Sequence, residues 1–273
     1  MISHKLVVYS CLTGGYDEIR QVVNDIDIDF IMFTDLNENE WPKDTGWTFR
    51  KVDNSLASTP HLLNRYYKMH PHIIVPEYKT SFYIDTNIQI LKTDALKERN
   101  KTLTESNAFI AISNHPDRKC IYEECKAVVK FNKIKKIDAY KHKQYLINEG
   151  YPKNNGLFEN NLIWRNNHNE NTILLMNEWW LIVNKEGLSK RDQLSFVYVL
   201  WKLGMECVQL FGEKTCTRNH PEFKIKGGHK VKSNIVGFKE IRKTIIQIRL
   251  QKDIKIIRLF GIYLLNKNTK SSH

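Results

Sequence analysis

Short apolar runs that end in polar residues recur along the chain. They lie at residues 5–11, 27–35, 47–53, 81–90, 107–113 and 157–167. Runs of this length that are bounded by turn-forming residues are typical of β-strands, above all where Val, Ile and Phe are frequent. The pattern therefore predicts six strands, the first of which reads KLVVYSC.

Longer segments between the strands carry apolar residues at a helical period. Helices are predicted at residues 59–70, from about 94 onward, and at 119–149, 171–187 and 190–204. Thr59 and Pro60 are typical of a helix start, and Pro71 ends the same helix. Strands that alternate with helices predict an α/β fold built on a sheet with parallel strands.

The composition adds a strong bias in charge to this picture. With 273 residues, 41% of them hydrophobic and 26% charged, the chain has the make-up of a folded protein with one sizeable core. Its 42 Lys and Arg against 30 Asp and Glu give a net charge of +12. Such a charge favours polyanionic partners, which include nucleic acid, an anionic membrane, and nucleotide or lipid phosphates.

The cysteines and the N-terminal residues indicate the compartment. Five cysteines at irregular positions form neither a secreted disulfide framework nor a paired zinc-binding pattern. The N-terminus lacks the ordered parts of a secretion signal, and no apolar window of about 18 residues exists. We therefore expect a cytoplasmic protein without a membrane-spanning segment.

The last 37 residues differ from the rest of the chain. From Gly237 onward, nine Lys or Arg stand against Glu240 and Asp253, with apolar residues spread between them. This pattern predicts a catalytic domain over residues 1–236 and a basic amphipathic helical tail over 237–273. The tail is suited either to lying on an anionic membrane surface, which would make the protein peripheral, or to packing on the domain.

Polar clusters follow four of the predicted strands. They are Thr13-Gly14-Gly15, Thr34-Asp35, Asp85-Thr86-Asn87 and Asn114-His115. Ligands of open α/β sheets bind at the carboxyl ends of the parallel strands, where the loops vary without disturbing the core. We therefore expect these clusters to form one site.

Asp85 and Asn87 suggest a metal site at that edge. In an extended strand residues two apart point the same way, so both side chains would face one ligand. Carboxylate and amide oxygens suit Mg²⁺ or Mn²⁺, and a bound diphosphate would supply the missing ligands. The alternative is that Asp85 caps a turn and Asn87 tolerates an unusual backbone angle.

The chain resembles a known family. The motifs that carry the resemblance are, in order, CLTGGYDEI, DIDFIMFTD, NRYYKMHPH with PEYKTSFYIDTNIQI, NHPDRKCIYEE and KRDQLSFVYVLWK. Together they are similar, over about residues 5–230, to the glycosyltransferase-like family called domain of unknown function 616. The resemblance implies a GT-A fold, a Rossmann-like, mostly parallel sheet flanked by helices, and a metal site of the D-x-D type. Asn87 replaces the second acid of that pattern, which leaves the strength of metal dependence open.

The resemblance also implies roles for the polar clusters. The nucleotide pocket would be lined by Thr13, Gly14, Gly15, Tyr16 and Asp17, with Asp35 at the base or ribose. Arg65 and Lys68, three apart on one helical face, would neutralise the diphosphate. Without the resemblance, these two cations are equally typical of a solvated basic face.

A second polar set and two late histidines complete the candidate residues. His115, Arg118, Glu123 and Glu124 would lie near the sugar or the acceptor; the alternatives are a turn at His115 and a solvated helix surface at the two acids. The candidates for completing the metal shell, beside Asp85 and Asn87, are His220 and His229.

Arg191 and Asp192 open the last predicted helix and, with Glu124, are the candidate catalytic residues. Asp192 would either deprotonate an acceptor hydroxyl or stabilise an oxocarbenium-like charge. An Asp at a helix start is otherwise often only a cap or a favourable partner of the helix dipole.

The sequence thus predicts a metal-dependent glycosyltransferase. It would move a sugar from a nucleoside diphosphate sugar, with UDP as the expected nucleotide, to a hydroxyl of a glycan or a lipid-linked oligosaccharide. Synthesis of a bacterial surface polysaccharide such as a capsule is the expected setting. A phospho- or nucleotidyltransferase would also place a metal beside a nucleotide, but no Walker-type loop occurs. A nucleic-acid-binding protein is disfavoured because acids stand at the strand ends and no known binding module is present.

Overall fold

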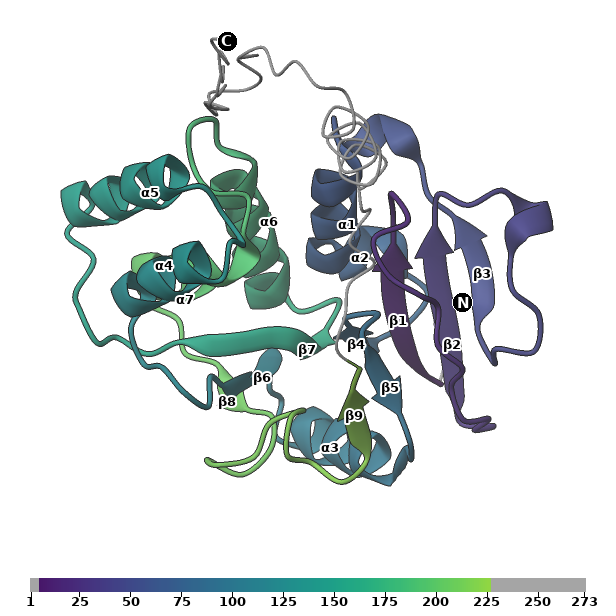
Figure 1. The fold of residues 1–273 in the computed structure, drawn as a ribbon. Helices are drawn as coiled ribbons and strands as arrows, with labels where there is room; N and C mark the ends of the chain where they lie inside the picture. Colours follow the sequence, from purple (N-terminus) through teal and green to yellow (C-terminus); the bar gives the residue numbers. More distant parts are fainter. Residues whose placement is uncertain (1–4, 227–273) are drawn as a thin grey trace, which may run out of the picture. The chain divides into compact units, whose positions relative to one another are not determined.

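The protein, described from a computed structural model over residues 5–226, is built on a seven-stranded sheet (Figure 1). The strand order is β3-β2-β1-β4-β7-β6-β8, and only β7 runs antiparallel to its two neighbours. The strands are β1 (Leu6–Leu12), β2 (Ile28–Thr34), β3 (Thr48–Lys51), β4 (Thr80–Ile84), β6 (Ile110–Asn114), β7 (Phe158–Asn166) and β8 (Val208–Gln209). The predicted fold class, a mixed and mostly parallel GT-A sheet flanked by helices, is confirmed.

Helices cover both faces of this sheet (Figure 1). They are α1 (Pro60–Met69), α2 (Pro71–Ile74), α3 (Asp94–Glu105), α4 (Ile121–Lys130), α5 (Lys136–Asn148), α6 (Glu170–Asn184) and α7 (Phe196–Leu203). In β4, Phe82 and Ile84 join the core layer under α3, whereas Tyr83 between them packs on the opposite face with α1. This alternation is the two-residue period of a strand that is buried on both sides.

The predicted strand at 81–90 is in fact two strands joined by a turn. β4 ends at Ile84, and the N–H of Ile88 donates to Asp85 O at 3.0 Å. The second strand, β5 (Ile88–Ile90), leaves the main sheet and pairs with β9 (Phe223–Ile225). The extended geometry that we expected to aim Asp85 and Asn87 in one direction is therefore wrong, because residues 85–87 form the turn that the alternative interpretation proposed.

The predicted helix over 119–149 is divided into α4 and α5. Asn132 has a φ of +53°, and its N–H donates to Val129 O at 3.0 Å, while Lys133 N–H donates to Val128 O at 2.8 Å. These two bonds are the Schellman pattern that ends a helix, with Asn in the left-handed position. The helical period on both sides of Asn132 concealed this break.

The last predicted helix begins later than its sequence suggests. Residues Asp192–Leu194 form a 3-10 turn, and α7 starts only at Phe196. The carbonyl of Asp192 accepts the indole N–H of Trp179 at 3.1 Å as well as the N–H of Ser195 at 3.2 Å. Asp192 therefore lies in a separate, tightly held turn in front of the α-helix.

Some predictions fall on residues that the structure does not describe. The basic tail over 237–273 and His229 lie outside the described residues. Within residues 5–226, no helix is long and apolar enough to cross a membrane. The five cysteines all lie in the described part and are free thiols.

Candidate functional site

Helix α1 is fastened to strand β1 beside the carboxyl end of that strand. Thr13 Oγ1 donates to Pro60 O at 2.6 Å, and Asn64 Nδ2 donates to Cys11 O at 2.5 Å. Asn64 Oδ1 in turn accepts from Arg65 Nη1 at 3.0 Å. These hydrogen bonds fix the first turns of α1 over the strand ends, and Asn64 orients the guanidinium of Arg65.

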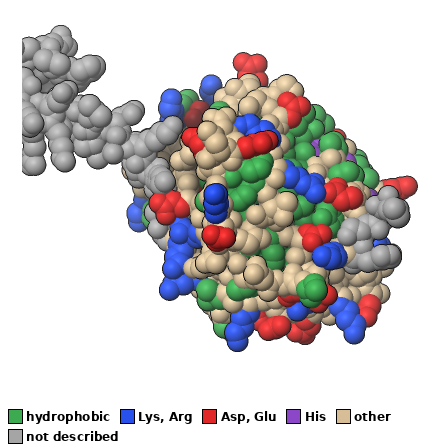
Figure 2. Space-filling view, turned by 90° about the vertical axis from the view of Figure 1, so that its right-hand side faces the viewer, with side chains coloured by type: hydrophobic (Ala, Val, Ile, Leu, Met, Phe, Trp, Pro, Cys, Tyr) green, Lys and Arg blue, Asp and Glu red, His purple; other side chains and the backbone are tan. Residues whose placement is uncertain are grey.

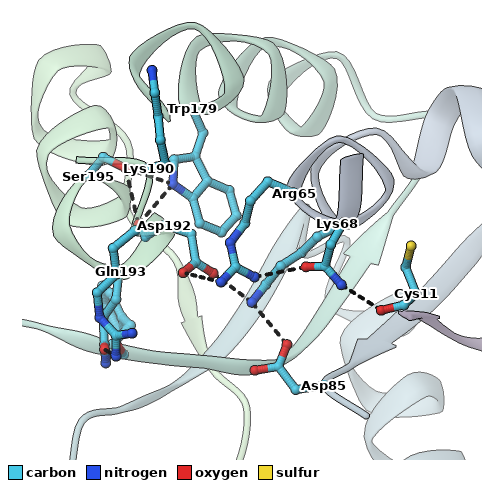
Figure 3. A network of polar contacts seen from close by, with 12 residues as sticks. Cys11, Arg65, Lys68, Asp85, Trp179, Lys190, Asp192, Gln193 and Ser195 are labelled. Carbon is cyan, nitrogen blue, oxygen red and sulfur yellow. Dashed lines mark hydrogen bonds and ion pairs between the residues drawn. The ribbon is translucent and has the colours of Figure 1, made fainter. Parts of the chain in front are cut away.

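Two cations of α1 enter a buried network with carboxylates from two other segments (Figure 3). Lys68 Nζ lies 2.7 Å from Asp192 Oδ2 and 3.3 Å from Asp85 Oδ1, while Arg65 Nη2 lies 3.5 Å from Asp192 Oδ1. The Lys68 side chain is only 1% exposed and that of Arg65 is 15% exposed. The alternative of a solvated basic face is therefore wrong for these residues.

Asp192 is held in its ionised form by these cations. Burial by itself raises the pKa of the Asp192 carboxyl, but the charges of Arg65 and Lys68 outweigh burial and hold this pKa well below its usual range. A carboxylate with such a low pKa is a weak proton acceptor. Asp192 therefore stands as a buried negative charge between two cations.

The loop after β1 approaches the same place with two glycines. Gly14 and Gly15 have φ values of +67° and +60°, in the left-handed region. The N–H of Gly14 donates to Asp35 Oδ2 at 2.6 Å, and a Cβ at Gly14 would lie 2.9 Å from Pro60 Cβ. Asp35 thus connects the end of β2 to this loop by a hydrogen bond. The contact of Asp35 with a base or ribose stays a prediction.

The end of this loop meets the turn after β4. Thr86 Oγ1 donates to Asp17 Oδ2 at 3.4 Å, and Asp17, which is buried, also pairs with Arg20 at 3.5 Å. Tyr16 is 55% exposed next to it, and burial of the remainder raises the pKa of its phenol, while the nearby charge of Arg191 opposes this shift. The structure therefore brings Tyr16 and Asp17 together with the cations and with residues 85–87.

The second predicted polar set forms an adjoining cluster. Arg118 Nε lies 2.5 Å from Glu124 Oε2, and Arg191 Nη2 lies 3.8 Å from Glu124 Oε1. Glu124 is 1% exposed, whereas Glu123 beside it is exposed on the surface of α4. Glu124 therefore joins the loop after β6 to the turn that carries Arg191 and Asp192, and Glu123 takes no part.

His115 organises the loop after β6. Its Nδ1 accepts the N–H groups of Asp117 at 3.1 Å and Arg118 at 3.2 Å. Burial and then the charge of Arg118 lower the pKa of His115 to about 4. A neutral ring that accepts two backbone N–H groups fits the alternative interpretation of His115 as a turn residue.

Two residues that support Lys68 were missed in the sequence. Arg165, fully buried in β7, donates to the carbonyl of Lys68 and to Tyr9 Oη, the latter at 2.8 Å. Tyr9 Oη donates to Tyr67 O at 3.1 Å. A charged residue inside a central strand was the available signal, because such a residue is rarely buried without a specific partner.

The predicted metal ligands are only partly brought together. Asp85 has a side chain that is 34% exposed, and Asn87 follows in the same turn. The register of β5 with β9 pairs Ile88 with Ile225, so that His220 precedes the end of β9 that is farther from Asp85. Within residues 5–226, no three His, Cys, Asp or Glu side chains are grouped as metal ligands. The chain's own ligands fit a divalent cation only if phosphate and water complete its shell.

Comparisons with known proteins place this chain in a family. The model of the TOD1/MUCI70 glycosyltransferase-like domain matches residues 1–226. No curated protein matches the sequence. Solved structures similar to this chain include mouse xyloside xylosyltransferase 1 in its apo form, with 9% identity, a TM-score of 0.45, and coverage of 82% of this chain and 97% of that one.

Two further solved structures are glycosyltransferases with ligands. Core-mannan synthase A from Aspergillus fumigatus, in its Mn/GDP form, has 10% identity and a TM-score of 0.44 over 72% of this chain and 70% of that one. The galactosyltransferase LgtC, in complex with donor and acceptor sugar analogs, has 12% identity and a TM-score of 0.41 over 74% and 72%. The resemblance to a glycosyltransferase-like family is confirmed by the family match, and the chain belongs to the TOD1/MUCI70 family of glycosyltransferase-like domains.

Proposed function

We propose that this protein transfers a glycosyl group from a nucleoside diphosphate sugar to a hydroxyl of an acceptor glycan. The observation that carries the proposal is a pair of partly exposed arginines beside the strand ends. The charges of Arg65 and Arg191 both act on Tyr16 at the end of the loop after β1, and Arg65 Nη2 lies 3.5 Å from Asp192 Oδ1. The planar fork of donors on a guanidinium suits the oxygens of a diphosphate.

The surrounding charges suit a diphosphate. The side chains of Arg65 and Arg191 are 15% and 29% exposed, so both reach a ligand that arrives from solvent. Lys68 lies deeper, where it holds Asp85 and Asp192 in place. In a water-poor site, cations fixed beforehand stabilise the charge that develops on a leaving diphosphate without further reorganisation.

Asp192 in this proposal acts through its charge. Its low pKa argues against proton abstraction and for a role in fixing Arg65 and Lys68 on the donor. Of the two roles that the sequence left open, electrostatic stabilisation is the one we propose. Asp85, with its side chain 34% exposed, is the carboxylate that can reach the donor, through a bound cation.

A divalent cation would bind together with the donor. Asp85 and Asn87 would hold Mn²⁺ or Mg²⁺, with the diphosphate as the other ligand. When bound, the cation would act as a Lewis acid on the leaving group. Because Lys68 Nζ lies 3.3 Å from Asp85 Oδ1, this lysine already supplies one positive charge there, and we expect the added cation to strengthen donor binding rather than create it.

The acceptor side is proposed from the second cluster. Arg118, Glu124 and Arg191 adjoin the cations and would orient the sugar or the acceptor. We propose a UDP-sugar as donor and a glycan or lipid-linked oligosaccharide as acceptor. The setting we propose is bacterial surface polysaccharide synthesis at the cytoplasmic face of a membrane.

A donor screen tests the function. Purified protein is incubated with UDP- and GDP-sugars, with and without Mn²⁺, and the released nucleotides are separated by chromatography. We expect release of a nucleoside diphosphate from at least one donor, and its loss in Lys68→Met but not in Lys101→Met, an exposed control. Release of a nucleoside monophosphate or of pyrophosphate would instead identify a phospho- or nucleotidyltransferase.

A further inference from the structure

Half of the net charge of the protein lies on one surface outside the candidate site. We call residues 126–153, which comprise most of α4, all of α5 and the adjoining loops, the α4–α5 surface. It carries eight lysines against Asp138 and Glu149, a net charge of +6. The lysines are Lys126, Lys130, Lys133, Lys135, Lys136, Lys141, Lys143 and Lys153.

In the part of the chain that the structure describes, these lysines have no carboxylate partner. All except Lys143 are exposed, and none takes part in an ion pair within residues 5–226. The face of the protein on the side of β2 and β3 is different, because Figure 2 shows basic and acidic side chains interspersed on it. A concentration of one sign of charge attracts an opposite charge over about a Debye length, roughly 8 Å at physiological salt.

Helix α5 also carries apolar residues on its outer face. Ile137 is 53% exposed, Tyr140 is 59% exposed and Ile147 is 49% exposed. Their spacing of three and seven residues places them on one side of the helix. The opposite side packs into the core through Ala139, His142 and Leu146. Phe131, 61% exposed in the loop before α5, adds a fourth apolar side chain to the same surface.

A pocket opens between α4 and α5 on this surface. Its volume is about 550 Å³, and three of the lysines line it together with one carboxylate, Glu123, two tyrosines and Ile147. The lysines and tyrosines of the pocket are Lys126, Lys143, Lys153, Tyr122 and Tyr151. Ammonium groups around an aromatic-lined hollow can take a phosphate headgroup with the glycerol or sugar attached to it.

We propose that the α4–α5 surface docks onto an anionic phospholipid bilayer. Lysines beside exposed aromatic and aliphatic side chains combine attraction to lipid phosphates with burial of apolar area at the headgroup level. Nucleic acid would use the lysines and could stack on Phe131 and Tyr140, but it would not bury the aliphatic side chains of Ile137 and Ile147, which a headgroup layer does. In Figure 1, α5 lies outside α4 with respect to the sheet, which leaves this face open within the described residues. The proposal does not depend on the proposed function.

Vesicle sedimentation of the full chain tests the proposal. The vesicles contain phosphatidylcholine alone or phosphatidylcholine with phosphatidylglycerol. The charge variant replaces Lys133, Lys135, Lys136 and Lys141 by Ala. The matched control removes the same charge from exposed lysines elsewhere, Lys43, Lys79, Lys92 and Lys101.

We expect wild-type protein and the control variant to bind the anionic vesicles and not the neutral ones. The charge variant should bind at least about tenfold more weakly, because four lysines no longer attract the anionic surface. Because all four lysines are exposed, the thermal midpoint of unfolding should be unchanged. Wild-type binding in the charge variant, or no binding of wild type to anionic vesicles, would overturn the proposal.

A second variant separates a membrane from other polyanions. It replaces Ile137, Tyr140 and Ile147 by Ser, which leaves the net charge unchanged. We expect weaker vesicle binding in this variant, since the apolar face no longer enters the headgroup layer. Vesicle binding equal to wild type in this variant would overturn the role of the apolar face. A loss of single-stranded RNA binding in the charge variant without a loss of vesicle binding would show that the lysines serve nucleic acid and not a bilayer.

Discussion

The protein uses its cations in two contrasting ways. At the strand ends, Lys68 is buried and paired with Asp85 and Asp192, and Arg65, 15% exposed, is paired with Asp192, at distances of 2.7 to 3.5 Å. On the α4–α5 surface, the lysines are mostly exposed and have no ion-pair partner in the described residues. The same residue type therefore meets two different electrostatic environments within one domain.

The difference teaches what each group of cations can do. A buried cation loses its hydration, so it must be paired with an anion. The ion pair then fixes the position of the cationic side chain, which suits it to one particular ligand. An exposed cation keeps its hydration, contributes little to stability, and acts over distance on any surface of opposite charge. Substitutions should therefore damage stability and activity together at the strand ends, and only binding at the α4–α5 surface.

The largest effect is expected from Lys68→Met. It leaves Asp192 and Asp85 without their shared ammonium, and removing one partner of a buried ion pair costs roughly 3 to 5 kcal/mol. Urea unfolding followed by circular dichroism measures the loss of stability, and nucleotide release at a temperature where the variant is folded measures the loss of activity. Lys101→Met, exposed and unpaired in the described part, should change stability by less than about 0.5 kcal/mol.

Asp192→Asn should have the next largest effect, and the effect should depend on pH. The pKa of Asp192 is lower in the folded state than in the unfolded state. Its ionisation therefore stabilises the fold fully above the unfolded pKa of about 3.9. This stability is lost as the pH falls from that value through the folded-state pKa. We expect wild type to be more stable than Asp192→Asn by about 1 to 3 kcal/mol at neutral pH. The difference should shrink below about pH 4. An equal difference at all pH values would contradict an ionised Asp192.

Gly14→Ala should have a smaller effect, with Gly15→Ala as its matched control. Both glycines have positive φ, so either substitution should cost roughly 1 to 2 kcal/mol in backbone strain. Only the new Cβ at Gly14 meets another atom, Pro60 Cβ at 2.9 Å, whereas that at Gly15 meets nothing within 4 Å. We expect Gly14→Ala to be the more damaging to both stability and donor binding. Equal effects would mean that the loop does not need its close approach to α1.

The smallest effect on stability is expected from lysines of the α4–α5 surface. Lys135→Ala and Lys136→Ala should each change the free energy of unfolding by less than about 0.5 kcal/mol. Vesicle binding should still fall, and added salt should weaken it further in wild type. Nucleotide release should keep its rate in both variants, because these lysines lie outside the strand-end network. A fall in that rate would show that the two groups of cations act together.

Much of the fold could be predicted from the sequence because its signals are local. The start of α1 at Pro60, with Thr59 as its cap, follows from residue types that have one strong preference. The break between α4 and α5 was missed because a single Asn in the left-handed conformation ended the helix inside a continuous helical pattern. The turn at residues 85–87 was only the alternative interpretation, because β5 continues the apolar run on its far side.

The candidate site could be predicted only in its parts. Arg65, Lys68, Asp85 and Asp192 each stood out by position or by family resemblance. Lys68 is buried between the carboxylates of Asp85 and Asp192. This placement depends on how α1 packs against the turn before α7, and no local sequence pattern encodes that packing. The support that Arg165 gives to Lys68 is equally non-local, since it joins a central strand to the end of α1.

Calorimetric titration with UDP and GDP, in the presence and absence of Mn²⁺, tests the central claim most directly. The claim is that the strand-end cations bind the diphosphate of a nucleotide. We expect one of the nucleotides to bind wild type and Lys101→Met equally, and Lys68→Met at least about tenfold more weakly, which corresponds to 1.4 kcal/mol or more. If neither nucleotide binds wild type under either condition, or if Lys68→Met binds as wild type does, the claim is contradicted.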